Sequence, residues 1–128
     1  MRSMIYLSFE QIIELHDALI DKFGGLLGIR ERGLLESALA APMMAVFGVE
    51  LHKTIYNKAA AYLFYIAKNH AFLDGNKRTA AAAALSFLRA NGKSPKYNVE
   101  DFLEFAVSVA EGQADLDTIS NYFEKICS

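Results

Sequence analysis

The stretch AAAYLFYIAKNHAFLDGNKRTAAAAALSFL, residues Ala59 to Leu88, decides how this chain folds. Its two ends are apolar on every side of a helix, and such helices are normally buried at the centre of a protein. The residues between them, KNHAFLDGNKR, form the densest group of ionisable side chains in the sequence. A turn between two buried helices does not need these polar groups, so their presence indicates a site at the mouth of a rigid core.

Capping residues, glycines and prolines divide the rest of the chain into further helices. Ser8 with Gln11 is a capping-box pattern, and Asn98 and Asp115 are typical residues before a helix. No segment shows a strong strand pattern, so we predict an all-α fold. The expected architecture is a compact bundle of about six to seven helices around a central buried helix-loop-helix. The expected helices cover residues 9–23, 34–41, 43–47 (a short helix or turn), 51–69, 76–91, 99–109 and 116–126.

Length and composition restrict the function classes. The chain has 128 residues, a net charge of −2 and a single cysteine. We therefore expect one domain over residues 1–128, with no internal disulfide. The weakly acidic balance argues against DNA binding by the chain itself, because nucleic-acid binders are usually basic. The sequence shows no signal peptide and no apolar run long enough for a membrane helix, so we expect a cytoplasmic protein without a membrane partner.

The end of the polar stretch has the features of an anion-binding site. Gly75 permits close approach of the backbone to a ligand. Asn76 opens a helix whose free N–H groups and positive dipole end favour phosphate. Lys77 and Arg78 add two cations in a first turn that normally prefers acids. This arrangement is unfavourable unless an anion is bound, and it predicts phosphate binding.

Two further side chains suggest what could happen to a bound phosphate. Asp74 could hold Mg²⁺, which takes few carboxylates together with phosphate oxygens. Histidine is the side chain that can exchange a proton near neutral pH, so His70 is the natural general base for a hydroxyl nucleophile. A structural interpretation also remains open at this point. His70 and Asp74 could be helix caps, and Lys77 and Arg78 could be ordinary surface cations.

The order of residues in HAFLDGNKR, His70 to Arg78, resembles the signature loop of the Fic/Doc superfamily. The upstream segment GGLLGIRERGLLESAL, Gly24 to Leu39, is similar to the Doc branch, and so is FLRANG, Phe87 to Gly92. Two positions depart from the adenylyl-transferring Fic pattern. Lys77 stands where that pattern has glycine, and Ala81 stands where it has a second phosphate-binding arginine. Both departures favour the Doc type, which is similar to death-on-curing toxins of toxin–antitoxin modules.

The resemblance implies a kinase that uses ATP and Mg²⁺ to phosphorylate a Thr or Ser hydroxyl of a translation factor, elongation factor Tu in the family, and so arrests translation. It also implies an antitoxin that covers the active-site cleft. The implied catalytic residues are His70 as the base, Asp74 orienting Mg²⁺ or the acceptor, and Arg78 stabilising developing charge. The implied phosphate-binding residues are Gly75, Asn76, Lys77 and Arg78, and Phe72 is expected to anchor the loop.

Two other functions stay open from the sequence. One is an adenylyltransferase of the Fic type, and the other is a non-catalytic module that binds a nucleotide or an antitoxin. Outside the polar stretch, His16 is expected to be a histidine at the edge of the core, and His52 a surface or near-cap residue. Cys127 lacks a histidine or basic residue beside it, so we expect no nucleophilic role. The irregular segment 26–33 is a candidate edge for target binding.

Overall fold

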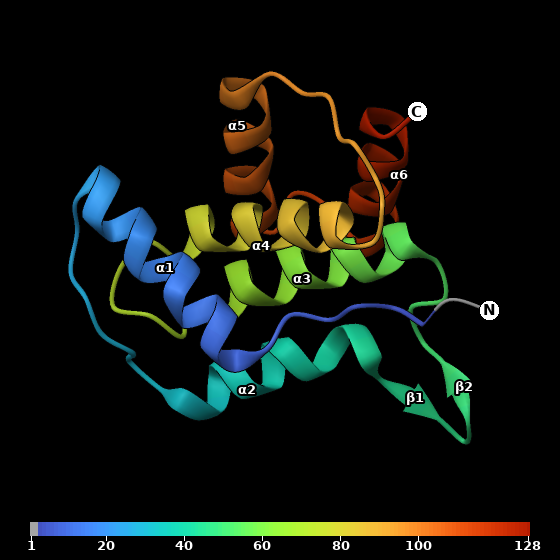
Figure 1. The fold of residues 1–128 in the computed structure, drawn as a ribbon, viewed down its shortest axis with the longest axis horizontal. Helices are drawn as coiled ribbons and strands as arrows, with labels where there is room; N and C mark the ends of the chain where they lie inside the picture. The colour runs from blue at the N-terminus through green and yellow to red at the C-terminus, as the bar shows by residue number, and fades with distance from the viewer. Residues whose placement is uncertain (1–2) are drawn as a thin grey trace.

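The computed structural model describes residues 3–128 as a helical bundle built around two antiparallel central helices (Figure 1). In chain order the elements are α1 (Phe9–Phe23), α2 (Arg32–Ala40), the 3-10 helix η1 (Ala41–Met43), β1 (Ala45–Val46), β2 (Val49–Glu50), α3 (Ile55–Asn69), α4 (Asn76–Ala90), α5 (Val99–Ala110) and α6 (Leu116–Ile126). The predicted helical bundle is confirmed, with six α-helices and one short hairpin in the described part of the chain. No helix within residues 3–128 has both the length and the hydrophobicity needed to cross a membrane.

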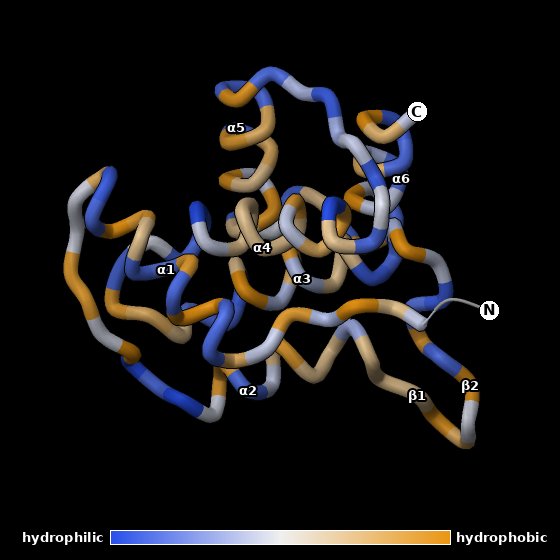
Figure 2. The backbone as a smooth tube through the Cα atoms, in the orientation of Figure 1, coloured by the Kyte–Doolittle hydropathy of each residue, from blue (hydrophilic) through white to orange (hydrophobic). Residues whose placement is uncertain are grey.

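The centre of the core is formed by α3 and α4. Figure 1 shows these helices side by side, with α1 and α2 on one side and α5 and α6 on the other. Contacts join α3 to α2, α4, α5 and α6, whereas α4 contacts α1, α3 and α5. Alanines allow the close approach of these helices, since Ala59, Ala60, Ala80 and Ala83 are fully buried. Figure 2 shows hydrophobic residues along α3 and α4, and also in α1, α5 and the hairpin. This packing fixes the α3–α4 connection at one end of a rigid hairpin.

Four of the helices begin with a side-chain cap. The Ser8, Thr54, Asn98 and Asp115 side chains accept hydrogen bonds from backbone N–H groups at the starts of α1, α3, α5 and α6. Such caps satisfy donors that a helix cannot satisfy itself, each contributing roughly 1 kcal/mol. The caps predicted at Ser8, Asn98 and Asp115 are confirmed. By contrast, α2 and α4 have no side-chain cap among the described residues.

The start of α3 differs from the prediction. The sequence suggested a helix from residue 51, but α3 begins at Ile55. Thr54 and Asn57 form a reciprocal capping box, with hydrogen bonds of 3.0 Å and 3.2 Å. This capping box sets the start of the helix, because it satisfies two backbone donors at once. The hydrophobic pattern, from which the earlier start was predicted, does not report the cap.

The region expected as a short helix or turn over residues 43–47 is a second correction. The 3-10 helix η1 ends at Met43, and a hairpin follows in which Ala45 pairs with Glu50 and Val46 with Val49. Phe47 and Gly48 both have positive φ, 50° and 77°. Positive φ at both central residues matches the right-handed twist of a tight hairpin, and this geometry forms strands where a helix was predicted.

A buried lysine attaches this hairpin to the core. Lys58 of α3 is 2% exposed, and its Nζ donates to Glu50 Oε1 at 3.1 Å and to the carbonyl oxygen of His52. His52 is half-buried, and burial together with the nearby Lys58 charge lowers its pKa. A buried ammonium needs such partners because desolvation of an unpaired charge is costly. The hairpin lies at the end of α3 opposite the α3–α4 connection (Figure 1).

Candidate functional site

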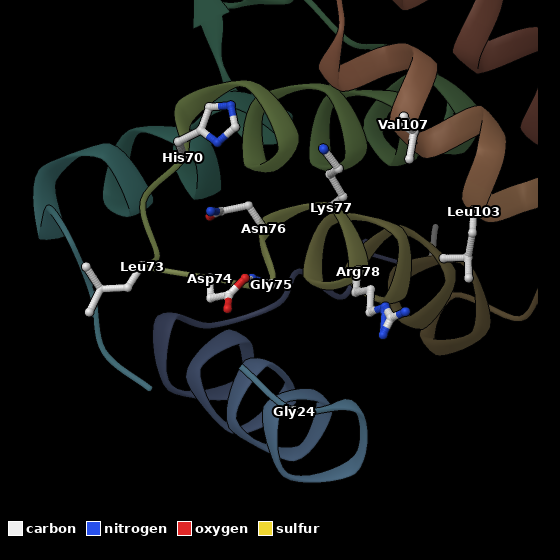
Figure 3. A pocket seen from close by; sticks show the side chains of 10 residues that line it. All are labelled: Gly24, His70, Leu73, Asp74, Gly75, Asn76, Lys77, Arg78, Leu103 and Val107. Atoms are coloured by element: carbon white, nitrogen blue, oxygen red, sulfur yellow. Dashed lines mark hydrogen bonds between the residues drawn. The ribbon is translucent and has the colours of Figure 1, made fainter. Parts of the chain in front are cut away.

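The α3–α4 connection and the start of α4 line a pocket of about 540 Å³ (Figure 3). The lining residues are Gly24, His70, Leu73, Asp74, Gly75, Asn76, Lys77, Arg78, Leu103 and Val107. Every site residue predicted from the sequence therefore lines this pocket, except Phe72. Phe72 is 2% exposed and packs into the core beneath the loop, where a loop anchor was expected. The sequence did not indicate the wall that Leu103 and Val107 of α5 contribute.

The first turn of α4 presents free backbone donors to this pocket. Its N-cap is Gly75, with φ 76° and ψ 17°, and a glycine has no side-chain oxygen to cap the helix. The N–H groups of residues 76, 77 and 78 come before the first hydrogen bond of the helix, which Thr79 N donates to the Gly75 oxygen at 3.0 Å. This turn has no acidic side chain, and Lys77 and Arg78 are both exposed. Backbone donors, helix dipole and two cations all favour an anion.

Asn76 closes the loop upon itself. Its Oδ1 accepts from the Phe72 N–H and its Nδ2 donates to the Phe72 oxygen, both at 3.0 Å. Figure 3 shows the Asn76 carboxamide turned toward the loop and away from Lys77 and Arg78. With its side chain engaged, Asn76 can meet an anion through its backbone N–H. The two hydrogen bonds hold the loop between α3 and α4 in one shape.

The underside of the loop rests on α1. The His16 ring, 1% exposed, stacks on Phe72 with 3.8 Å between centroids and an interplanar angle of 6°. Its Nε2 lies 2.7 Å from the carbonyl oxygen of Asp74, and its Nδ1 lies 3.0 Å from Asp17 Oδ1. The prediction that His16 belongs to the core is confirmed, but its direct contact with the loop was missed. The only local signal was a histidine on an apolar helix face beside an aspartate.

The segment before α2 holds the end of the loop that directly follows α3. His70 follows α3 in the left-handed conformation, with φ 49° and ψ 49°, which is uncommon for a residue other than glycine. Arg30 Nε donates to the His70 carbonyl oxygen at 2.8 Å. Arg30 N also donates to the Ala71 oxygen at 2.7 Å, and an isolated β-bridge joins Ile29 to Phe72. These contacts fix the backbone of His70 while its side chain stays exposed.

Asp74 and Arg78 lie at the edge of the pocket nearest α1. Asp74 Oδ1 accepts from the Gly75 N–H at 3.0 Å, and Oδ2 accepts from the Leu26 N–H at 3.3 Å. The carboxylate is exposed and keeps lone pairs for another partner. The Arg78 guanidinium stacks over the Phe23 ring at 4.3 Å, which leaves its edge donors available. A carboxylate and a guanidinium thus flank the helix N-terminus.

The helical fold and this loop define the class of protein, and comparison with known sequences agrees. The sequence model of the Fic/DOC family matches residues 6–88, so the chain belongs to the Fic/DOC family. Among curated proteins, it is similar to "Toxin Doc" of Mycolicibacterium smegmatis, with 44% identity over 100 residues covering 77% of each chain. It is also similar to "Protein kinase doc" of Escherichia phage P1, with 32% identity over 123 residues covering 96% of each chain. The resemblance to the Doc branch is confirmed.

Proposed function

We propose that this protein is the toxin of a toxin–antitoxin module and acts as a kinase in the cytoplasm. It would transfer the γ-phosphate of ATP to a Thr or Ser hydroxyl of a translation factor, elongation factor Tu by resemblance, and arrest translation. Two relatives support this proposal by their names, one as a toxin and the other as a protein kinase. The substrate class and the reaction are inferences that rest on the pocket.

One observation carries the proposal. The helix with free N–H groups at its uncapped end also carries Lys77 and Arg78, which line the same pocket as His70. A phosphate at this end would accept from the backbone donors and meet both cations, as phosphates do at other helix N-termini. A general base beside a phosphate site is what transfer to a hydroxyl requires. A surface with no catalytic or binding role would not need free N–H groups, two cations and a histidine in one pocket.

The proposed roles follow from the positions of the side chains. The His70 imidazole would remove the proton from the acceptor hydroxyl as its oxygen attacks the γ-phosphorus of ATP. The bond from that phosphorus to the β–γ bridging oxygen breaks, and ADP leaves with the bond electrons. Lys77, Arg78 and the backbone N–H groups would stabilise the negative charge on the phosphate oxygens. Phosphoryl transfer depends mainly on such positioning and charge stabilisation, so a rigid loop suits it.

Asp74 is the residue that would hold Mg²⁺. No group of three or more potential metal ligands occurs in residues 3–128, so the protein alone offers no complete metal site. One exposed carboxylate beside a phosphate site fits Mg²⁺, which typically binds one or two carboxylates together with substrate phosphates. When bound, Mg²⁺ would neutralise charge on the ATP phosphates.

The position of Ala81 favours phosphate over AMP transfer. The adenylyl-transferring pattern has an arginine at this position, where it binds nucleotide phosphates. Ala81 is 3% exposed and belongs to the hydrophobic core. Lys77, in place of the glycine of that pattern, brings a charged side chain into the pocket instead.

An antitoxin is the second partner that we propose. The pocket rim is apolar as well as charged, because Leu73 is 53% exposed and Val107 36% exposed. Leu26 and Leu27, 65% and 63% exposed, belong to the segment that contacts the loop. A protein that covers the pocket would bury this apolar surface and gain stability from it.

The test is intact mass spectrometry of elongation factor Tu after incubation with the protein, ATP and Mg²⁺. We expect a gain of one phosphate, which His70→Ala abolishes. His52→Ala is the matched control, since it removes a histidine remote from the pocket and should leave transfer unchanged. A gain of AMP would refute the kinase assignment. If the mass of elongation factor Tu does not change, the protein is incubated with labelled ATP and a whole lysate. Absence of any labelled protein in that lysate would refute the enzyme assignment.

A further inference from the structure

We propose that His16 is a positioning residue for the loop between α3 and α4. Its hydrogen bond to the Asp74 oxygen sets the orientation of the Asp74–Gly75 peptide. That peptide in turn places the Asp74 carboxylate and the first N–H groups of α4. The catalytic consequence rests on the proposed function, whereas the effect on the loop does not. Neither the motif nor the pocket lining includes His16.

The contacts of His16 assign a hydrogen to its Nε2 atom. The Asp74 carbonyl oxygen can only accept a hydrogen bond, so Nε2, 2.7 Å away, must donate. The Asp17 carboxylate oxygen, 3.0 Å from Nδ1, is also an acceptor, so Nδ1 must carry hydrogen as well for this contact to restrain the ring from the other side. Stacking on Phe72 at 6° fixes the plane of the ring. Three contacts thus determine where the donor points.

The orientation of this peptide matters because its two polar groups point in opposite directions. In a trans peptide the C=O and the following N–H are antiparallel. The Asp74 C=O points inward to His16, so the Gly75 N–H points outward, where it donates to Asp74 Oδ1 at 3.0 Å. Inverting this peptide would withdraw the N–H and release the carboxylate. One hydrogen bond in the core thereby controls the direction of groups in the pocket.

Glycine makes this control necessary. Gly75 can adopt conformations with negative or positive φ at little cost, so its own sterics do not select the observed φ of 76°. Contacts with neighbouring groups must select it, and His16 is close enough to contribute, since its Nε2 would lie 3.5 Å from a Cβ at this position. Burying a polar ring is unfavourable without hydrogen bonds, and the Asp74 carbonyl oxygen supplies one for His16. The use of histidine on the buried face of α1 is explained by the loop contact.

Two substitutions separate stacking from hydrogen bonding. His16→Phe keeps an aromatic ring against Phe72 but loses the donor, whereas His16→Gln loses the ring but keeps an amide donor that can reach the same oxygen. We expect His16→Phe to lower kcat by about ten- to a hundredfold, the range that follows from small misplacements of reacting groups. His16→Gln should recover most of this loss. Equal losses in the two variants, or wild-type kcat in His16→Phe, would overturn the proposal.

Two measurements test the loop independently of transfer. The amide nitrogen of Gly75 shares its peptide with the Asp74 oxygen, so its NMR signal should move in His16→Phe and return toward wild type in His16→Gln. Binding of inorganic tripolyphosphate should weaken in the same order. If the wild-type protein transfers no phosphate, the proposed function fails, and these two measurements alone decide the role of His16. An unchanged Gly75 signal and unchanged tripolyphosphate affinity in His16→Phe would overturn the role.

A last measurement needs no variant and therefore remains available if His16→Phe does not fold. Nitrogen NMR of the wild-type imidazole distinguishes a ring nitrogen that carries hydrogen from one that does not. The proposal requires hydrogen on Nε2 of His16. A bare Nε2 in the folded protein would overturn it, because the bond to the Asp74 oxygen could then not exist.

Discussion

Replacing Gly75 with alanine adds one methyl group at the point where the loop enters α4. The backbone there has φ 76°, in the left-handed region that favours glycine. The new Cβ would lie 3.0 Å from Ile20 Cδ1, closer than ordinary van der Waals contact. Ile20 is 7% exposed, so its side chain has little space in which to move. Gly75→Ala therefore combines backbone strain with crowding.

Gly92, just beyond the other end of α4, provides the matched control. Its φ is 87°, and apart from its own chain neighbours no heavy atom of the described residues lies within 4 Å of a Cβ placed there. The left-handed conformation costs about 1–2 kcal/mol for alanine, a penalty that both variants share. Crowding against Ile20 adds about 1 kcal/mol at Gly75, the lower end of the range for overpacked sites. Gly75→Ala should thus lower the free energy of unfolding by roughly 2–3 kcal/mol, against roughly 1–2 kcal/mol for Gly92→Ala.

The assay is urea unfolding followed by circular dichroism. With a denaturant slope of about 2 kcal/mol per molar, the midpoint should fall by roughly 1–1.5 M in Gly75→Ala and by roughly 0.5–1 M in Gly92→Ala. The slope itself should not change. Equal shifts would refute the crowding at Ile20. A stable Gly75→Ala protein would refute the left-handed conformation from which the loop geometry follows.

Three further predictions concern other contacts. Arg30→Ala removes the donor to the His70 carbonyl oxygen, so we expect kcat for phosphate transfer to fall by about tenfold with little change in the affinity for ATP. Steady-state kinetics and ATP titration measure the two quantities, and a wild-type kcat would show that His70 needs no such support. The Tyr62 hydroxyl accepts from the Leu7 N–H at 2.9 Å, and burial raises the pKa of Tyr62 from 10.0 to about 12. The stability that this shift contributes is complete below pH 10 and is lost as the pH rises from about 10 to about 12. Denaturation midpoints should therefore fall in that pH window for the wild type and fall less for Tyr62→Phe. Identical pH profiles of the two proteins would contradict the shift. Tripolyphosphate at a hundred times its Kd should stabilise the wild-type fold by about 2.7 kcal/mol, and at the same concentration the rise in thermal midpoint should be smaller in Arg78→Ala. A wild-type thermal midpoint that tripolyphosphate leaves unchanged would contradict the phosphate site.

The sequence is most informative where structure depends on near neighbours. The caps at Ser8, Asn98 and Asp115 involve residues three positions apart, and all three were predictable. The buried central helices were also predictable, because their composition is apolar on all sides. The hairpin was not, because its strands are only two residues long and Phe47 is an unusual residue for its turn.

In the candidate site, too, residues close together in sequence were predictable and distant contacts were not. The pocket residues from His70 to Arg78 are continuous in sequence, so a pattern of residues could identify them. Their supports could not be identified in this way, because His16 lies 58 residues from Asp74, and Arg30 lies 40 residues from His70. No local pattern states that a histidine in α1 meets a carbonyl group near α4. Such contacts depend on how the helices pack.

The α5 wall of the pocket has a consequence for the synthesis of this protein. The pocket lining extends from Gly24 through the α3–α4 loop to Val107. A chain emerging from a ribosome therefore exposes the whole signature loop well before the helix that completes the pocket. Because synthesis runs from the N-terminus, α5 becomes available only after the loop, and the pocket is complete only when α5 packs beside α4. Premature termination before α5 would release a product that carries the full set of predicted catalytic side chains but lacks α5 and α6, which pack against the central helices α3 and α4.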